Sequence, residues 1–321
     1  MRRVVGRRGT TLTGWTAARE PKLTLPREPL HAVVIGPGRL GLTLTASLTR
    51  AGLAVPAVVP SPGARLDPSA VPPRLALRDA LDGDVDVVWI AVPDDAIEGV
   101  AHDVADALPT VLDHPVAAIH SSGLGSLELL APLQGRVAGL LSLHPLQTFA
   151  GPGGAEALAG VPMAVTGATR ADVDFGTWLA RRLGAAPFEL PDEAKPVYHL
   201  AAAVASNLFV ALESEAAELL AAAAGCSPAA AADLLRPLVA TTAANLGATD
   251  PAQALTGPVA RGDVGTVRVH LEELAEQPSR YADAYRALSL QALHIAAPRL
   301  DDEAVHALRR LLGAEADGGE S

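Results

Sequence analysis

Short apolar runs alternate with amphipathic stretches from Leu30 to about Leu190. Six runs are rich in β-branched residues and end in turn residues, namely AVVIG, AVPAVV, VDVVWIAVP, PVAAIHSSG, VAGLLSLHP and VPMAVTG. This pattern is typical of strands buried in a parallel sheet. The stretches DAIEGVAHDVADAL and ADVDFGTWLARRLG have helical periodicity instead. The first half of the chain is therefore predicted to form an α/β domain with a doubly wound parallel sheet.

The pattern changes after Leu190 and becomes helical. PVYHLAAAVASNLFVALESEAAELLAAAAG is a run of 30 residues with few helix breakers. Further helical stretches are separated by CSP, GATDP, AEQPS and APRLDD, whose Ser, Asp and Pro residues supply caps and stops. Leu and Val recur at spacings of three and four, which indicates packed helices. We expect an α/β domain at 30–190 and an all-α domain at 191–321.

Composition and charge narrow the class of protein. Net charge is -11, and the first 28 residues are basic, so the rest of the chain is more acidic still and nucleic acid is not expected as a partner. Residues 1–29 have low hydrophobicity and are predicted to be a disordered basic extension. The sequence lacks a signal peptide and an uninterrupted apolar stretch of about 18 residues, so no membrane contact and a cytoplasmic location are expected. A single cysteine, Cys226, excludes an internal disulfide framework and the multi-cysteine zinc patterns, and no metal site is expected.

The segment GPGRLG lies between a predicted strand and a predicted helix. In that context G-x-G-x-x-G is a dinucleotide fingerprint: Gly36 allows the tight turn, Gly38 lets a pyrophosphate approach the backbone, and Gly41 lets helix and strand pack closely. The N-terminus of the helix adds free N–H groups. The predicted cofactor-binding residues of this loop are Gly36, Pro37, Gly38, Arg39, Leu40 and Gly41.

The second strand lacks the acidic residue that accepts hydrogen bonds from the ribose of NAD. AVPAVV runs into PSPGARLD, where no carboxylate comes before Asp67. Ser61 and Arg65 in this loop could instead bind a 2′-phosphate, or they could be ordinary loop residues. The sequence favours NADP as the cofactor.

Ligands of doubly wound sheets gather beyond the carboxyl ends of the strands. One such end offers Val92, Pro93 and Asp94 to the cofactor, although Asp94 or Asp95 could instead cap the following helix. Two further ends offer small polar groups and imidazoles to a substrate. These candidates are His120, Ser121, Ser122, Gly123 and His144.

The long helix provides candidates for proton transfer. Lys195, His199 and Ser206 share one face at about 100° per residue, and Asn207 lies beside them. Carbonyl reduction needs a proton donor as hydride arrives, and a lysine of lowered pKa or a histidine can serve. The alternative is an exposed Lys195 in the first turn, where Pro196 marks the start of the helix.

Six spaced motifs together resemble a bacterial family of Rossmann-like proteins with a C-terminal domain of unknown function. The motifs are GPGRLG, AVPDDAI, HSSGLGS, LHPLQTF, KPVYHLAAAVASNLFVAL and LTGPVARGDVGTVRVHL. The resemblance implies a 6-phosphogluconate-dehydrogenase-like helical second domain. Related families include pyrroline-5-carboxylate reductase, the β-hydroxyacid dehydrogenases and ketopantoate reductase, and some members are regarded as alternative ketopantoate reductases.

The catalytic residues of these relatives match this sequence only in part. β-Hydroxyacid dehydrogenases and ketopantoate reductases have a catalytic lysine on this helix and an asparagine four residues later. Lys195 matches the lysine, but His199 stands at the asparagine position and Asn207 lies farther along. Arg261 could bind a substrate carboxylate or pair with Asp263.

The leading hypothesis is an NADPH-dependent reductase of a small 2-oxo acid, with ketopantoate as the most concrete substrate. Lys195, His199 and Asn207 would be catalytic, and Ser206 and Arg261 would contact the carboxylate substrate. One alternative is an imine reductase like pyrroline-5-carboxylate reductase, and another is a non-catalytic NADP-binding sensor or interaction protein. The apolar C-terminal helices, as the resemblance also implies, predict a homodimer.

Overall fold

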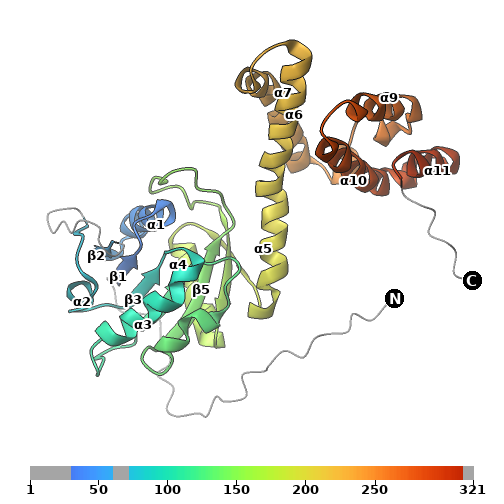
Figure 1. The fold of residues 1–321 in the computed structure, drawn as a ribbon. Coiled ribbons are helices and arrows are strands. Elements are labelled where there is room, and N and C mark those ends of the chain that lie inside the picture. The colour runs from blue at the N-terminus through green and yellow to red at the C-terminus, as the bar shows by residue number, and fades with distance from the viewer. Residues whose placement is uncertain (1–29, 61–71, 314–321) are drawn as a thin grey trace, which may run out of the picture. The chain divides into compact units, whose positions relative to one another are not determined.

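The computed structural model describes residues 30–60 and 72–313 (Figure 1). The basic extension and two of the predicted NADP contacts, Ser61 and Arg65, lie outside the described residues. The chain divides into two compact units, the first ending at Ser206 and the second beginning at Asn207. The boundary predicted near Pro191 falls just before a long helix, whereas the compact units divide within that helix.

The first unit is built on a seven-stranded sheet of order β2-β1-β3-β4-β5-β6-β7. The strands are β1 His31–Ile35, β2 Ala54–Val59, β3 Val87–Ile90, β4 Ala117–His120, β5 Gly139–Pro145, β6 Pro162–Gly167 and β7 Ala186–Glu189. The first five strands pair in parallel. The chain order reverses between β1 and β3, which is the point where such sheets bind ligands.

Helices cover both faces of this sheet. The helices of the first unit are α1 Arg39–Arg50, α2 Leu77–Ala80, α3 Ile97–Ala107, α4 Arg170–Arg182 and α5 Lys195–Ala203, with 3₁₀ turns η1 Asp94–Ala96, η2 Leu127–Leu133 and η3 Asp192–Ala194. α1 and α4 pack on one face of the sheet, and α2, α3 and η2 pack on the other. Successive strand residues point to opposite faces of the sheet and contribute to two separate hydrophobic cores. Val34 and Trp89 pack with α1 and α4 residues, whereas Val33 and Ile90 pack with α3 residues. The predicted doubly wound α/β domain is confirmed.

Two features of the sheet correct the prediction. VPMAVTG forms a strand as expected, but this strand, β6, runs antiparallel to β5. A parallel return needs a crossover connection, usually a helix, and residues 146–161 between β5 and β6 contain neither helix nor strand. β7 was not predicted, because its sequence APFE is short and only partly apolar.

The second unit is helical, as predicted. Its helices are α6 Phe209–Ala224, α7 Pro228–Ala248, α8 Pro251–Ala254, α9 Val264–Ala275, α10 Ser279–Ala296 and α11 Asp302–Leu311, with 3₁₀ turns η5 Val259–Arg261 and η6 Ala297–Arg299. Val267, Leu293 and Leu308 form the core of α9, α10 and α11. By contrast, α6 and α7 bury only alanines against each other.

The long helical run between the two units contains a π-helical turn, η4 Val204–Leu208. A π turn rotates the following residues relative to a regular α-helix. The face shared by Lys195 and Ser206 therefore cannot be counted at 100° per residue through this turn. Within the described residues, the run Asp192–Ala224 is also the one helix long and apolar enough to cross a membrane by length and composition.

Candidate functional site

The GPGRLG segment forms a tight turn from β1 into α1. Gly36 has φ +95°, and a Cβ built on it would lie 2.6 Å from the carbonyl oxygen of Ala91. A Cβ on Gly41 would lie 1.9 Å from the carbonyl oxygen of Gly36. Only glycine fits these two positions without a backbone shift.

The space in front of this turn is open. A Cβ on Gly38 would meet no described atom within 4 Å, and Gly38 caps α1 without a side-chain hydrogen bond to the helix. The first N–H groups of α1 are therefore available to an anion. These features fit the pyrophosphate of a dinucleotide.

The neighbouring strand end borders the same turn. Val92 Cγ1 would lie 2.8 Å from a Cβ on Gly36, so the ends of β1 and β3 touch. Leu40 packs against the core beneath α1, and the Arg39 guanidinium donates to the carbonyl oxygen of Phe149 at 3.3 Å. Pro37 is half-buried and Pro93 is exposed. Pro37, Arg39 and Leu40 belong to the predicted cofactor loop and Val92 and Pro93 to the neighbouring strand end, and their contact with a cofactor stays a prediction.

The turn after β4 is held by the hydroxyl of Ser122. Its Oγ donates to Asp94 Oδ2 at 2.6 Å and accepts from the N–H groups of Gly125 at 2.6 Å and Leu124 at 3.2 Å. The alternative in which Asp94 or Asp95 caps the following helix is wrong, because neither η1 nor α3 has a side-chain cap and the Asp94 carboxylate accepts from Ser122 instead. Asp94 therefore links the ends of β3 and β4.

Two other substrate candidates on β4 also bond within the protein. Ser121 Oγ accepts from the indole N–H of Trp89 at 2.8 Å. His120 is fully buried, and its Nδ1 accepts from the backbone N–H of Ser122 at 3.1 Å. Burial, and then the nearby charge of Lys195, lower the pKa of His120 to about 3, so its imidazole is neutral at physiological pH. The substrate role of these residues stays a prediction.

Lys195 begins α5 and is buried, with 1% of its surface exposed. Its Nζ donates to the carbonyl oxygen of Ser122 at 2.9 Å and to Ser142 Oγ at 2.6 Å. An exposed Lys195 is therefore excluded. An ammonium has three donors, and these two bonds are the ones its Nζ makes among the described residues, so one donor stays available for a ligand.

Burial lowers the pKa of Lys195 to about 8, because the ammonium loses hydration. The carboxylates of Asp192 and Asp94 oppose this shift. Asp192 is fixed by the N–H of Leu127, which lies 3.1 Å from both carboxylate oxygens. A lysine with this pKa is mostly protonated at pH 7. Because its pKa is close to that pH, it gives up a proton more readily than an ordinary lysine.

A second contact joins α5 to β5. The Nδ1 of His144 and the hydroxyl of Tyr198 are hydrogen-bonded at 2.6 Å, and the two rings make an edge contact with centroids 5.5 Å apart. Burial, with Lys195 and His199, lowers the pKa of His144 to about 4. Burial raises the pKa of Tyr198 to about 12. A Cβ on Gly123 would lie 2.8 Å from His144 Nε2, so glycine makes room for this imidazole.

Three polar residues of this site were missed from the sequence. Ser142 lies two residues before His144 in LSLHP, and alternation along a strand places both on one face. Tyr198 lies three residues after Lys195, a spacing that also shares a helix face. Asp192 precedes the helix and showed no pattern. The first two could have been found by applying the same periodicity to every polar residue near the candidates.

The remaining predicted residues are less closely tied to this cluster. His199 is exposed, and its positive form contributes to the lowered pKa of His144. Ser206 is half-buried in the π turn. Asn207 and Arg261 belong to the second unit, where both are exposed. Asp263 caps α9 through Thr266 rather than pairing with Arg261 through a hydrogen bond. The roles of these residues stay predictions.

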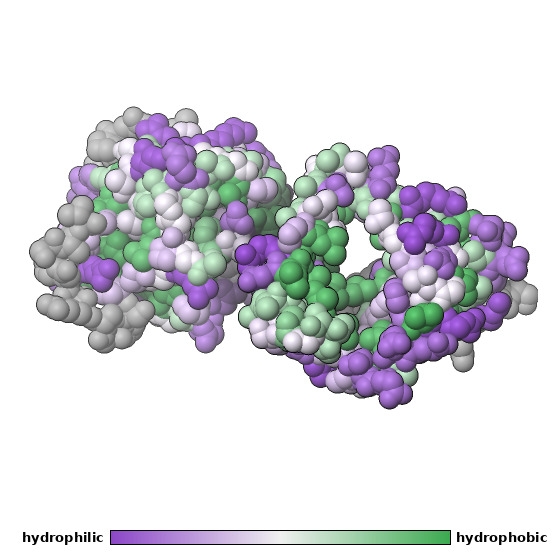
Figure 2. Space-filling model, turned by 90° about the horizontal axis from the view of Figure 1, so that it is seen from above, coloured by the Kyte–Doolittle hydropathy of each residue, from purple (hydrophilic) through white to green (hydrophobic). Residues whose placement is uncertain are grey.

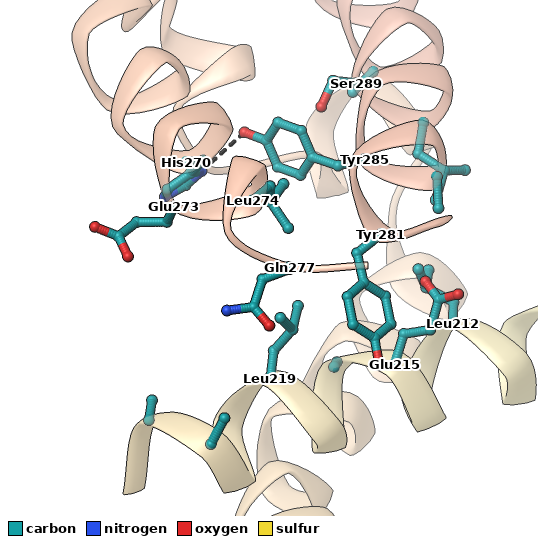
Figure 3. A pocket seen from close by; sticks show the side chains of 16 residues that line it. Leu212, Glu215, Leu219, His270, Glu273, Leu274, Gln277, Tyr281, Tyr285 and Ser289 are labelled. Carbon is teal, nitrogen blue, oxygen red and sulfur yellow. Dashed lines mark hydrogen bonds between the residues drawn. The ribbon is translucent and has the colours of Figure 1, made fainter. Parts of the chain in front are cut away.

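The second unit contains a separate cavity of about 820 Å³ lined by α6, α9 and α10. Figure 3 shows Leu219 of α6, Leu274 of α9 and Tyr281 of α10 bordering it, with the hydrogen bond between His270 and Tyr285 on one side. The lining is mostly apolar. We found no cluster of three metal-ligating side chains in the described parts of either unit.

Comparisons with known proteins agree with this architecture. Residues 161–292 match DUF2520, a domain of unknown function, which confirms the resemblance for this part of the chain. No curated protein sequence matches the chain.

Solved structures share the fold over most of both chains. A Thermotoga maritima protein has 22% identity and a TM-score of 0.63, covering 84% of this chain and 99% of its own. A Bacteroides fragilis protein named as an NADP oxidoreductase has 21% identity and a TM-score of 0.62, with coverage of 83% and 98%. An imine reductase from Myxococcus stipitatus, solved with NADP⁺, has 19% identity and a TM-score of 0.54, with coverage of 88% and 100%. These similarities establish the fold.

Proposed function

We propose that the protein is a cytoplasmic NADPH-dependent oxidoreductase that reduces a small 2-oxo acid, with ketopantoate as the most specific candidate. The observation that carries the proposal is a buried lysine of lowered pKa at the carboxyl edge of the same sheet that holds a glycine turn fitted to a dinucleotide. Solved structures with this fold include a protein named as an NADP oxidoreductase and an imine reductase solved with NADP⁺, which supports the choice of reaction class and cofactor.

The residues of the first unit would divide the work. Gly36, Gly38 and the N-terminus of α1 would hold the pyrophosphate of the cofactor, which supplies a hydride when bound. The Lys195 ammonium would donate a proton to the substrate's carbonyl oxygen. The carbonyl of Ser122 and the hydroxyl of Ser142 hold Nζ in place, so the amine needs no reorganisation when the substrate arrives.

The test is NADPH oxidation over a panel of 2-oxo acids that includes ketopantoate. Turnover in wild type and a loss of at least about 100-fold in Lys195→Met would support the proposal. Val197→Ala is a matched control, because Val197 lies in the same helical turn and is 71% exposed. Near-normal turnover in Lys195→Met would remove the lysine from the mechanism, and tighter binding of NADH than NADPH would remove NADP as the cofactor.

A second candidate function is imine reduction. The shared fold with the Myxococcus stipitatus imine reductase favours it, and a buried ammonium can protonate an imine nitrogen as well as a carbonyl oxygen. The same panel distinguishes the two reactions when cyclic imines are included. Tight NADPH binding without oxidation of any substrate would point to a nucleotide-binding sensor instead.

We also propose that the protein forms a homodimer through α6 and α7. α7 is mostly apolar, with Asp233 and Arg236 as its two charged residues, yet Ala231 is its one buried residue. Leu234 and Leu238, four residues apart on one side of α7, are each 64% exposed. Figure 2 shows hydrophobic residues bordering a hollow in the second unit. α7 of a second copy has the apolar side chains to fill the cavity beside α6.

A lipid bilayer is a less suitable partner for these helices. The 17 residues between Lys195 and Glu213 are at the lower limit of the length that spans a membrane, and Lys195 is itself bonded inside the first unit. Light scattering should give a dimer for wild type and a monomer for Leu234→Glu/Leu238→Glu. Val111→Glu, at a 77% exposed position of the first unit, should stay dimeric. A monomeric wild type at micromolar concentration would refute the dimer, and a monomer captured by liposomes would point to a membrane as the partner of these helices.

A further inference from the structure

Two parallel side-chain contacts connect the first turn of α5 to the end of β5. Lys195 bonds to Ser142, and Tyr198 bonds to His144. The first contact is buried, whereas His144 and Tyr198 are half-buried. Residues two apart on a strand lie about 7 Å from each other, and residues three apart on a helix lie about 5–6 Å apart. The His144–Tyr198 pair is therefore the polar neighbour of Lys195 on its more open side.

The number of protons on this pair is fixed near neutral pH. His144 is neutral above its pKa of about 4, and Tyr198 is neutral below its pKa of about 12. A neutral imidazole has one N–H and a phenol has one O–H, so the pair has two donors. The bond between Nδ1 and the hydroxyl uses one of them. The other proton is on Nε2 when the phenol donates, and on the phenol oxygen when Nδ1 donates.

We infer that the His144–Tyr198 pair supplies one additional hydrogen-bond donor to an oxygen atom of the substrate beside Lys195. This inference rests on the proposed function, because it assigns a second contact in the same site. A small 2-oxo acid presents a carbonyl oxygen and a carboxylate oxygen a few ångströms apart. Two neighbouring donors can bind these two oxygens, and Lys195 and the His144–Tyr198 pair are neighbours because Ser142 and His144 lie two residues apart on one face of β5. Lys195 would bind the carbonyl oxygen, and the pair would bind the carboxylate.

Gly123 is part of this arrangement. Because a Cβ at this position would approach His144 Nε2 to 2.8 Å, a side chain there would displace the imidazole or cover its free nitrogen. Glycine at position 123 thus leaves room for the outer nitrogen of His144. His144 and Gly123, both predicted substrate residues, are brought together by this contact.

The experiment measures binding of oxamate, a non-reacting 2-oxo-acid analogue, to the NADPH-loaded protein, together with KM and kcat for the best substrate. Tyr198→Phe leaves the imidazole N–H without the bond that orients it, and His144→Gln replaces the rigid imidazole by a flexible amide. Each variant should therefore weaken oxamate binding and raise KM by about ten-fold, the effect of one misdirected hydrogen bond. NADPH affinity should not change. Because the pair provides a single donor jointly, the double variant should bind oxamate no more weakly than the worse single variant.

The second unit offers a matched control. His270 Nδ1 and the Tyr285 hydroxyl are bonded at 2.8 Å with the same edge-on ring geometry, so Tyr285→Phe removes an equivalent bond that the inference does not use. It should leave oxamate affinity unchanged. Nitrogen NMR of the imidazoles should show that oxamate shifts the signal that disappears in His144→Gln.

The outcomes separate the two proposals. The donor pair alone would be overturned if wild type binds oxamate and turns over substrate while Tyr198→Phe and His144→Gln are unaffected. Additive losses in the double variant would overturn it as well. A wild type that neither binds oxamate nor oxidises NADPH with any 2-oxo acid would overturn the proposed function and the donor pair with it.

Discussion

The lowered pKa of Lys195 can be measured without knowing the substrate. The sequence contains two lysines, Lys22 and Lys195, so protein labelled with ¹³C at the lysine ε-carbons gives two signals. We expect one of these signals to titrate near pH 8, because burial lowers the pKa of Lys195. The signal that disappears in Lys195→Met is assigned to Lys195.

The shift of Lys195 corresponds to a definite change in stability. A fall from 10.5 to about 8 is worth about 3 kcal/mol at the usual conversion. Between these two pH values the unfolded chain keeps a proton that the folded chain has lost, so the free energy of unfolding rises with pH. Below pH 8 both states are protonated, and the cost of burying the charge is present in full.

Urea unfolding of the first unit from pH 7 to 10.5 measures this cost. Wild type should gain up to about 3 kcal/mol relative to Lys195→Met across that range, because the variant lacks the titrating group and all other groups cancel in the difference. A constant difference, or a Lys195 signal that titrates near pH 10, would refute a desolvated lysine. The proton-donor role would then lose its electrostatic basis.

Two further substitutions test the loop and the lysine's partner. Gly41→Ala should reduce NADPH affinity strongly in a fluorescence titration, because its Cβ would lie 1.9 Å from the carbonyl oxygen of Gly36. Gly99→Ala is the control, because Gly99 lies in α3 with open space around it. This variant should stabilise the protein by about 1 kcal/mol and leave cofactor affinity unchanged. Ser142→Ala removes an acceptor from the ammonium, so the pKa of Lys195 should fall further, by about one unit or more; an unchanged or higher pKa in the same ¹³C titration would contradict the hydrogen bond.

The sequence predicted most of the sheet because its strands carry a local signal. AVVIG and VDVVWIAVP are continuous apolar runs, and both form central parallel strands. The direction of β6 depended on the absence of a crossover helix in residues 146–161, a stretch whose Gly and Pro residues were visible but were not used to decide the direction. β7 pairs at the edge with partly exposed residues, so hydrophobic periodicity could not reveal it.

A site residue was predictable where its own type and position along the chain marked it. It was not predictable where its role depends on a contact with a residue of another element. Lys195 was found from its spacing to His199 and Ser206 along one helix and from the family resemblance, and the structure buries it. Ser142 and Tyr198 were overlooked, because serine and tyrosine are common and only their contacts with Lys195 and His144 give them meaning. The spacing of residues along one helix or strand shows which of them share a face. It does not show which face of another element packs against them.

The serine turn after β4 changes how the chemistry of the site is distributed. Its side chains were predicted to bind substrate, yet Ser121 and Ser122 are bonded to Trp89 and Asp94. The turn instead presents the carbonyl oxygen of Ser122 to the Lys195 ammonium. Removing the Ser122 hydroxyl should therefore act on the lysine, because Oγ fixes the turn whose backbone holds Nζ. In Ser122→Ala, the lysine signal should broaden or shift its pKa while oxamate affinity falls in parallel; lost affinity with an unchanged lysine titration would return Ser122 to the role of a direct substrate contact.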